Sequence, residues 1–175
     1  MNRPQESEYA PDYQGYVEQV SESDIMAVLR GELDELDVLL GRVPAEKETY
    51  AYAEGKWTIR EIIGHLIDGE RVFGYRALCI ARGEQQNLPG FDQNDYMLTA
   101  PYNHIELEDL LSELRLVRLS NIAMFRSLDE AAWNRVGTAN GNEVTVRALA
   151  FIMAGHVRHH MNVLKERYLS NTSAA

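Results

Sequence analysis

The stretch TVRALAFIMAGHVRHHMNVL, residues 145–164, decides the fold class and holds three of the five histidines of the chain. An α-helix advances by about 100° per residue, so the faces of this segment can be read by counting. His156 and His160 are four residues apart and therefore lie one above the other on a single helical face. His159 falls at the edge of that face. The apolar neighbours of the two stacked histidines are Leu149, Met153, Val163 and Leu164.

The opposite face carries polar side chains and is expected to face solvent. These are Arg147, Arg158, Asn162 and Lys165. The two inward histidines need partners, because an unpaired buried polar group costs about 1–3 kcal/mol. Two stacked imidazoles can bind one divalent metal, or each can be a core residue bonded to a backbone carbonyl. The spacing alone leaves both interpretations open.

Three further segments show the same amphipathic period and predict helices that pack through one apolar face. The four expected helices span residues 22–41, 58–82, 106–128 and 145–169. Ser21 and Thr145 are suitable N-caps, and Thr58 with Glu61 forms the pattern of a capping box. Four helices of roughly 20 residues with little strand signal predict an all-α four-helix bundle.

The connection over residues 83–105 is unusually long. Loops above about 12–15 residues in a compact domain are usually functional or disordered. This one is rich in aromatic and acidic residues, which favours a functional loop, and its length permits a crossover between helices. A shorter connection contains Asn140-Gly141, a turn dipeptide suited to joining two short strands.

The chain of 175 residues is expected to form one domain, with the bundle over residues 21–169. Residues 1–20 are polar, contain two prolines and are predicted to form an extended arm that lies on the body. Residues 170–175 are predicted to be a frayed tail.

The composition excludes several classes of protein. The formal net charge of −10 argues against a nucleic-acid partner, which needs a basic face. No apolar run reaches the length of a membrane span, and the start of the chain carries no targeting signal. We therefore expect a cytoplasmic protein with no membrane partner. The single cysteine, Cys79, excludes an internal disulfide and is expected to be a buried structural thiol.

His65 is the third candidate metal ligand. It lies in the second predicted helix, about 100° from the centre of the apolar stripe, where two helices meet. Gly69, one turn later, leaves space beside it. His65, His156 and His160 therefore suggest a three-histidine metal site on two helices. Three imidazoles suit zinc, nickel, copper or iron and leave coordination positions open for water or substrate.

Two more residues are candidates for catalysis. Asp68 can orient His65 or act as a base, and its alternative role is a solvated helix carboxylate. His159 can carry a proton at the rim of the site, and its alternative is a solvated or capping role.

Three residues are candidates for substrate binding. Arg76 lies about three turns beyond His65 and can bind an anionic substrate group, with a surface salt bridge as the alternative. Asp92 and Tyr96, in the long connection, are expected to line the mouth of the site. Arg118 falls at the edge of the third helix's apolar stripe, where its head is expected to reach water.

The order and separation of three short motifs resemble the DinB/YfiT-like superfamily. These motifs are Trp57-Thr58-Ile59-Arg60-Glu61, His65-Leu66-Ile67-Asp68 and His156-x-x-His159-His160. The loop Pro89-Gly90-Phe91-Asp92 is also similar to members of that group, and the resemblance spans about residues 20–168.

The resemblance implies a four-helix bundle with crossed connections, often dimeric. It implies a divalent metal, commonly zinc or nickel, bound by His65, His156 and His160. Characterised relatives include transferases and isomerases that use bacillithiol, mycothiol or similar low-molecular-weight thiols.

The leading hypothesis is therefore a metal-dependent enzyme of the thiol-transferase or hydrolase type. It would act on a small-molecule substrate, with a low-molecular-weight thiol as co-substrate, and form a homodimer. Two alternatives remain: a non-catalytic bundle whose metal stabilises a dimer or is sensed, and a plain helical interaction module with satisfied core histidines.

Overall fold

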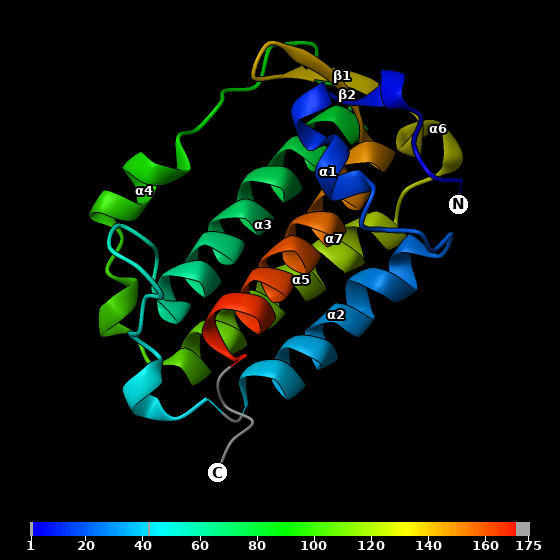
Figure 1. Ribbon diagram of the computed structural model, residues 1–175. Helices are drawn as coiled ribbons and strands as arrows, with labels where there is room; N and C mark the ends of the chain where they lie inside the picture. The colour runs from blue at the N-terminus through cyan, green and yellow to red at the C-terminus, as the bar shows by residue number, and fades with distance from the viewer. Residues whose placement is uncertain (1, 42, 171–175) are drawn as a thin grey trace.

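The computed structural model describes residues 2–41 and 43–170, and four long helices form its body (Figure 1). They are α2 (Ile25–Leu40), α3 (Ile59–Ala81), α5 (Leu107–Arg126) and α7 (Val146–Val163). This confirms the predicted all-α four-helix bundle. The shorter helices are η1 (Glu6–Glu8), η2 (Pro11–Tyr13), α1 (Gln14–Val17), η3 (Ala45–Lys47), α4 (Gln93–Thr99), η4 (Tyr102–His104), α6 (Glu130–Trp133) and the π turn η5 (Leu164–Tyr168).

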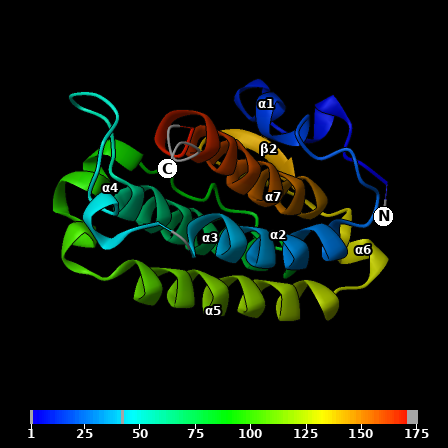
Figure 2. The same cartoon turned by 60° about the horizontal axis from the view of Figure 1, so that its bottom comes forward.

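The long helices are not arranged in simple chain order. Both α2 and α3 pack against α5 and α7, so α2 and α3 face each other across a diagonal of the bundle. Figure 2 shows α5 along one side and α7 along the other. Helices α3 and α5 run in the same direction. Their starts lie together, since Arg60 of α3 donates to Glu106, the N-cap of α5, at 2.6 Å, and their later turns also meet, since Arg118 of α5 donates to Glu70 of α3. The long connection therefore returns along the bundle, as Figure 1 shows for the segment containing α4, and the predicted crossover is confirmed.

Local capping chemistry explains where the helices begin. The Thr58 side chain accepts a hydrogen bond from the Glu61 amide, and the Glu61 carboxylate accepts one from the Thr58 amide, which is the predicted capping box. Thr145 caps α7 in the same way through the Ala148 amide. The first helix starts later than predicted, because Asp24 rather than Ser21 is its N-cap.

The Asn140-Gly141 dipeptide forms a tight hairpin turn. Asn140 has φ 52° and Gly141 has φ 75°, the left-handed pair required by a type I′ turn. It joins β1 (Val136–Ala139) to β2 (Asn142–Thr145), with Ala139 opposite Asn142. The hairpin also holds the long connection, because the Leu88 amide donates to the Thr138 carbonyl at 2.9 Å.

The N-terminal segment, predicted to be extended, instead forms the three short turns η1, η2 and α1. Helix α1 packs along α7, and η1 packs against β2 (Figure 1). Arg147 donates to Glu8 at 2.6 Å, and Arg158 donates to the Gln19 carbonyl at 2.9 Å. These two arginines were expected to face solvent, but they hold this arm, residues 2–20, against the bundle. Of the predicted frayed tail, residues 171–175 lie outside the described residues.

The core consists of two apolar clusters separated by a polar layer. One cluster contains Phe73 of α3 and Met153 of α7, and the other contains Ile67 of α3 and Val157 of α7. The polar side chains between them include Glu70 and His156, both buried. The apolar packing between the helices is thus interrupted at mid-bundle.

Arg118 is the centre of this polar layer, and the prediction that its guanidinium reaches water is wrong. Only 1% of its surface is exposed, so its head does not reach water. Its Nη1 donates to Glu32 of α2 at 2.9 Å, and its Nη2 donates to Glu70 of α3 at 2.8 Å. Glu32 also accepts a hydrogen bond from Arg158 of α7 at 3.0 Å. One ionic network therefore joins all four long helices.

The burial of Cys79 and the composition of the helices were also predicted from the sequence. Cys79 is half-buried rather than fully buried. Within the described part of the chain, no helix combines the length and apolar composition that crossing a bilayer requires.

Loss of Arg118 should destabilise the protein strongly. Arg118→Met removes the shared cation and leaves Glu70 buried without a counter-charge, so the free energy of unfolding should fall by about 3–5 kcal/mol. The matched control is Arg115→Met on the same helix, which removes a half-exposed pairing with Asp34 and Asp37. That control should cost less than about 1 kcal/mol. Urea unfolding measures both, and equal losses would contradict the assigned role of Arg118.

Candidate metal centre

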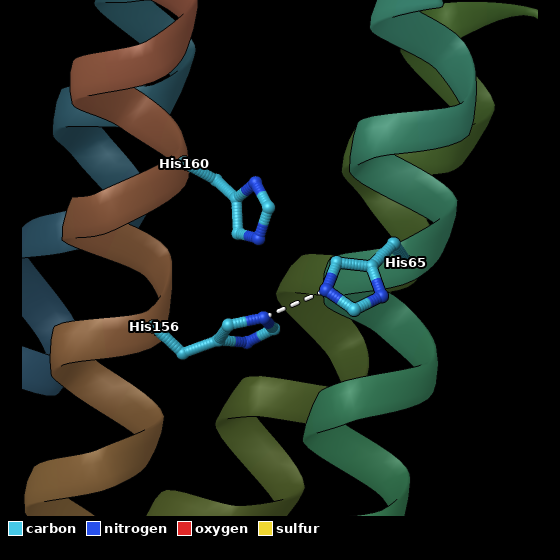
Figure 3. Close-up of side chains that lie close together, drawn as sticks. All are labelled: His65, His156 and His160. Atoms are coloured by element: carbon cyan, nitrogen blue, oxygen red, sulfur yellow. Dashed lines mark hydrogen bonds between the residues drawn. The ribbon is translucent and has the colours of Figure 1, made fainter. Parts of the chain in front are cut away.

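Three histidine side chains from two helices converge on one space at mid-bundle (Figure 3). His65 comes from α3, and His156 and His160 come from successive turns of α7. The Nε2 atoms of His65 and His156 are 2.8 Å apart. One ring nitrogen from each residue lies within 4.8 Å of the other two. The structure thus brings together the three residues that the sequence predicted as metal ligands.

A missing side chain on α3 makes room for this convergence. A Cβ atom at Gly69 would lie 2.9 Å from Cε1 and 3.1 Å from Nδ1 of His156. Those distances are shorter than ordinary van der Waals contacts, so a larger residue at position 69 would push the His156 ring away. The sequence argument placed the space at Gly69 beside His65, whereas the structure fills it with His156.

Burial keeps the three imidazoles uncharged. His65, His156 and His160 are 3%, 5% and 9% exposed. Removal from water lowers the pKa of His65 to about 4 and that of His160 to about 3, and the neighbouring histidines add to this effect. The pKa of His156 is also well below its ordinary value, again mainly because of burial. Neutral imidazoles have a free lone pair, which is the form that binds a metal.

The donor set fits a divalent cation. Zinc–nitrogen bonds of about 2.0–2.1 Å in a tetrahedral site place two nitrogens about 3.3 Å apart, and the cluster is within a small adjustment of that size. The Nδ1 atom of His160 is buried without a hydrogen-bond partner among the described residues. His160 is therefore not the satisfied core residue of the alternative interpretation, whereas His65 and His156 are hydrogen-bonded to each other. Three imidazoles together suit a divalent metal.

Two hollows open on opposite parts of the cluster. The first, about 350 Å³, is lined by His65 and His156 together with Tyr16, Phe73 and Phe91. The second, about 270 Å³, is lined by His159 and His160 together with Trp57 and Tyr168. Asn94 of α4 lines both. A group bound by the histidines would therefore be reachable from either side.

The N-terminal arm completes the wall of the first hollow, a contribution the sequence analysis missed. The Tyr16 ring lies 5.3 Å from the His156 ring and 5.5 Å from the His159 ring, measured between centroids. The arm approaches α7 closely at Gly155, where a Cβ atom would lie 1.9 Å from the Tyr16 carbonyl oxygen. The three tyrosines and the glycine of the histidine stretch were visible in the sequence, but their meeting depends on the docked arm.

The two residues predicted to be catalytic have different surroundings. His159 is half-buried, lines the second hollow and packs its ring 5.0 Å from that of His160. Asp68 accepts a hydrogen bond from the Tyr102 hydroxyl, and burial raises its pKa. The structure thus places His159 beside the cluster and gives Asp68 a partner other than His65.

Two residues predicted to line the mouth behave differently. Asp92 lines the first hollow, while its carboxylate caps α4 by accepting from the Asn94 and Asp95 amides. Tyr96 is 46% exposed and packs against Phe91, 5.3 Å between ring centroids. Tyr96 is not among the residues lining either hollow.

Arg76, the third predicted substrate-binding residue, is buried rather than engaged in a surface salt bridge. Its Nη2 donates to the Pro89 carbonyl at 2.7 Å. Its guanidinium carbon lies 5.9 Å from the ring centroids of both Phe73 and Phe91. Arg76 therefore lies behind two residues of the first hollow.

Comparison with known proteins agrees with this geometry. The family model described as the DinB superfamily matches residues 29–164, which include all three histidines. The chain belongs to the DinB superfamily. The arm, with Tyr16, precedes the matched region of this DinB superfamily protein.

Two curated relatives of this DinB superfamily member are named as metal-dependent hydrolases. A protein of Oceanobacillus iheyensis, named "Putative metal-dependent hydrolase OB0413", is 27% identical over 74% of this chain and 75% of its own length. A protein of Geobacillus kaustophilus, named "Putative metal-dependent hydrolase GK0616", is 23% identical over 77% of each chain.

Two solved structures share the fold. YfiT from Bacillus subtilis, described as "a probable metal-dependent hydrolase with an unusual four-helix bundle topology", superimposes with a TM-score of 0.79 at 16% identity. That comparison covers 99% of this chain and 95% of YfiT. The mycothiol-dependent maleylpyruvate isomerase has a TM-score of 0.66 at 15% identity, covering 83% of this chain and 61% of its own.

Gly69 offers a test of the cluster that leaves all three histidines in place. Gly69→Ala should displace the His156 ring and weaken zinc binding by at least tenfold, measured by competition with a chromophoric chelator. Gly31→Ala on α2 is the matched control, since a Cβ there meets nothing within 4 Å. Unchanged zinc affinity in both variants would show that zinc binding does not depend on the position of the His156 ring.

The lowered pKa values predict how pH affects the metal-free protein. As pH falls below about 6.5, the unfolded chain takes up protons on these histidines, whereas folded His65 and His160 stay neutral until about pH 4 and about pH 3. The unfolded state then binds more protons, so the free energy of unfolding falls with falling pH. Each unit of separation corresponds to about 1.4 kcal/mol.

Denaturant unfolding between pH 7 and pH 5 measures this slope. A His65→Gln/His160→Gln variant should show a shallower slope than the unaltered protein. Equal slopes would mean that the two histidines are not buried in neutral form.

Proposed function

We propose that this chain is a divalent-metal-dependent enzyme of the thiol-dependent transferase or hydrolase type, acting on a small molecule. The observation that carries this proposal is the convergence of three uncharged imidazoles at the wall of two hollows. Metal-dependent hydrolase names among its relatives support the coarse activity. The mycothiol-dependent isomerase among the structural neighbours supports a thiol co-substrate.

His65, His156 and His160 would hold the metal, with zinc and nickel as the first candidates. A divalent ion bound there supplies positive charge that lowers the pKa of a coordinated water or thiol and polarises a carbonyl. The helices contribute rigidity, because ligands on α3 and α7 cannot separate without disrupting the packed core.

The surrounding side chains would position substrate and move protons. His159 lies next to His160 at the second hollow, where its half-buried imidazole is placed to accept a proton from a bound molecule or donate one to it. The rings of Tyr16 and Phe73 offer an apolar wall in the first hollow, against which the carbon skeleton of a small substrate would pack.

Asp68 is better suited to a positioning role than to proton transfer at the histidines. Its bond to Tyr102 secures η4 against α3, and the Tyr102 ring occupies the space beside Gly64, where a Cβ atom would lie 2.2 Å from Cδ2. A homodimer and a cytoplasmic location stay predictions. Exposed Val38 on α2 and Leu116 on α5 supply apolar surface for the former.

Metal content tests this proposal directly. Tag-free protein should contain about one equivalent of zinc or nickel by mass spectrometry, and a His156→Ala/His160→Ala variant should contain none. His104→Ala is the matched control, because His104 lies in η4 outside the three-histidine cluster. Absence of metal from the unaltered protein, even after incubation with zinc or nickel, would contradict the metalloenzyme proposal.

Cobalt-substituted protein then separates the two reaction types. A new thiolate-to-cobalt absorption band on adding low-molecular-weight thiols would favour the transferase. Stoichiometric metal without any spectral response to thiols would favour the hydrolase. Metal that binds tightly but catalyses neither class of reaction would favour the non-catalytic, metal-stabilised bundle.

A further inference from the structure

Arg76 differs from the other buried arginines of this protein in having no counter-charge. Arg60 pairs with Glu48 and Glu106, and Arg118 pairs with Glu32 and Glu70. Arg76 is as buried as they are, with 3% of its surface exposed. Within residues 2–41 and 43–170, no carboxylate lies within the 4.0 Å of an ion pair with it.

The hydrogen bonds of Arg76 are also incomplete. A guanidinium has five N–H donors, and the one hydrogen bond found for it within the described chain runs from Nη2 to the Pro89 carbonyl. Its Nε is buried without a partner, as is that of Arg118, but Arg118 has two carboxylates at its other nitrogens and Arg76 has none. Withdrawing a cation from water without a compensating anion is strongly unfavourable, and such a group in a native protein calls for an explanation. The shortage is notable in a chain with 27 acidic and 17 basic residues.

The position of Arg76 connects it to the metal centre. Phe73 and Phe91 flank its guanidinium, and both rings line the first hollow, whose other walls include His65 and His156. Arg76 is seven residues after Gly69, where the His156 ring packs, which corresponds to about 10 Å along the helix axis. Helical side chains lean towards the N-terminus of their helix, so the guanidinium is directed back towards the histidines.

We propose that Arg76 forms an anion subsite of the first hollow, which takes a carboxylate of the substrate. This inference rests on the proposed function and adds to it the substrate class: a small carboxylic acid whose reacting group lies at the histidines. The planar fork of a guanidinium matches a carboxylate in two parallel hydrogen bonds. The half-buried Phe91 ring lines the hollow beside the guanidinium, so binding of a carboxylate at Arg76 requires this ring to move aside.

The competing explanation is that Arg76 only anchors the long connection through Pro89. That role uses one donor and no charge. Arg76→Gln keeps an amide donor for Pro89 but removes the cation, and Arg76→Lys keeps the cation but removes the fork. Arg71→Gln is the matched control, because Arg71 lies on the same helix as Arg76 but is half-exposed and pairs with Glu113 of α5.

The first measurement uses glutarate as the probe on zinc-loaded protein. Glutarate should raise the thermal unfolding midpoint of the unaltered protein and of Arg71→Gln by the same amount, and should leave Arg76→Gln unchanged. No stabilisation of the unaltered protein, or equal stabilisation of Arg76→Gln, would overturn the proposal. This measurement needs no thiol, so it decides the role of Arg76 even if the thiol chemistry proves wrong.

The second measurement places the carboxylate relative to the metal. ω-Mercaptocarboxylates of increasing chain length are compared with ω-mercaptoalcohols of equal length, using the thiolate band of the cobalt-loaded protein. At the chain length that spans from the histidines to Arg76, the carboxylate should bind at least tenfold more tightly than the alcohol. That ratio should fall to about one in Arg76→Gln and by at least threefold in Arg76→Lys.

The outcomes separate this inference from the proposed function. A thiolate band with no carboxylate preference at any length, or a preference that both Arg76 variants retain, would overturn the anion subsite while leaving the thiol chemistry intact. No band with any thiol would count against the thiol-dependent reaction, and the glutarate result would then decide the subsite. If Arg76→Gln fails to fold, Arg76→Lys carries the test: its carboxylate preference should fall by at least threefold, and an unchanged preference would overturn the proposal.

Discussion

The buried ionic network around Arg118 is the constraint on which the rest of this structure depends. Arg118 of α5 binds Glu32 of α2 and Glu70 of α3, and Arg158 of α7 binds the same Glu32. Apolar packing tolerates small sliding of one helix past another, whereas a buried charge without its partner is strongly unfavourable. The network therefore fixes the relative register of all four long helices at one level of the bundle.

The metal centre lies at that same level. Glu70 follows Gly69 directly, and Arg158 lies between His156 and His160 in the sequence of α7. Fixing the register of Glu70 and Arg158 thus also fixes how the His156 ring meets Gly69 and how it approaches His65. The polar layer divides the apolar core into two clusters, and it concentrates in one plane both the charges that hold the bundle and the imidazoles available to a metal.

Charge balance distinguishes the structural arginines from the one that lies near the hollow. The arginines that fix the fold each pair with at least one carboxylate, including Arg147 and Arg158, which hold the N-terminal arm in place. The docked arm brings Tyr16 to the histidines and closes one side of the first hollow. Behind the opposite part of the same hollow, Arg76 retains an uncompensated charge. Among the described residues, the other buried arginines, Arg60 and Arg118, each pair with two carboxylates. The lack of such a partner at Arg76 is the basis of the proposed anion subsite.

The sequence by itself determined the features that depend on near neighbours in the chain. The capping box at Thr58, the turn at Asn140-Gly141 and the shared face of His156 and His160 all follow from residues within four positions of each other. Only the tertiary structure decided the burial of Arg118, the pairing of Asp68 with Tyr102, the docking of the arm and the isolation of Arg76. Helical periodicity indicates which direction a side chain points, but the partner of a buried charge comes from a distant segment, and its position is set by how the helices pack.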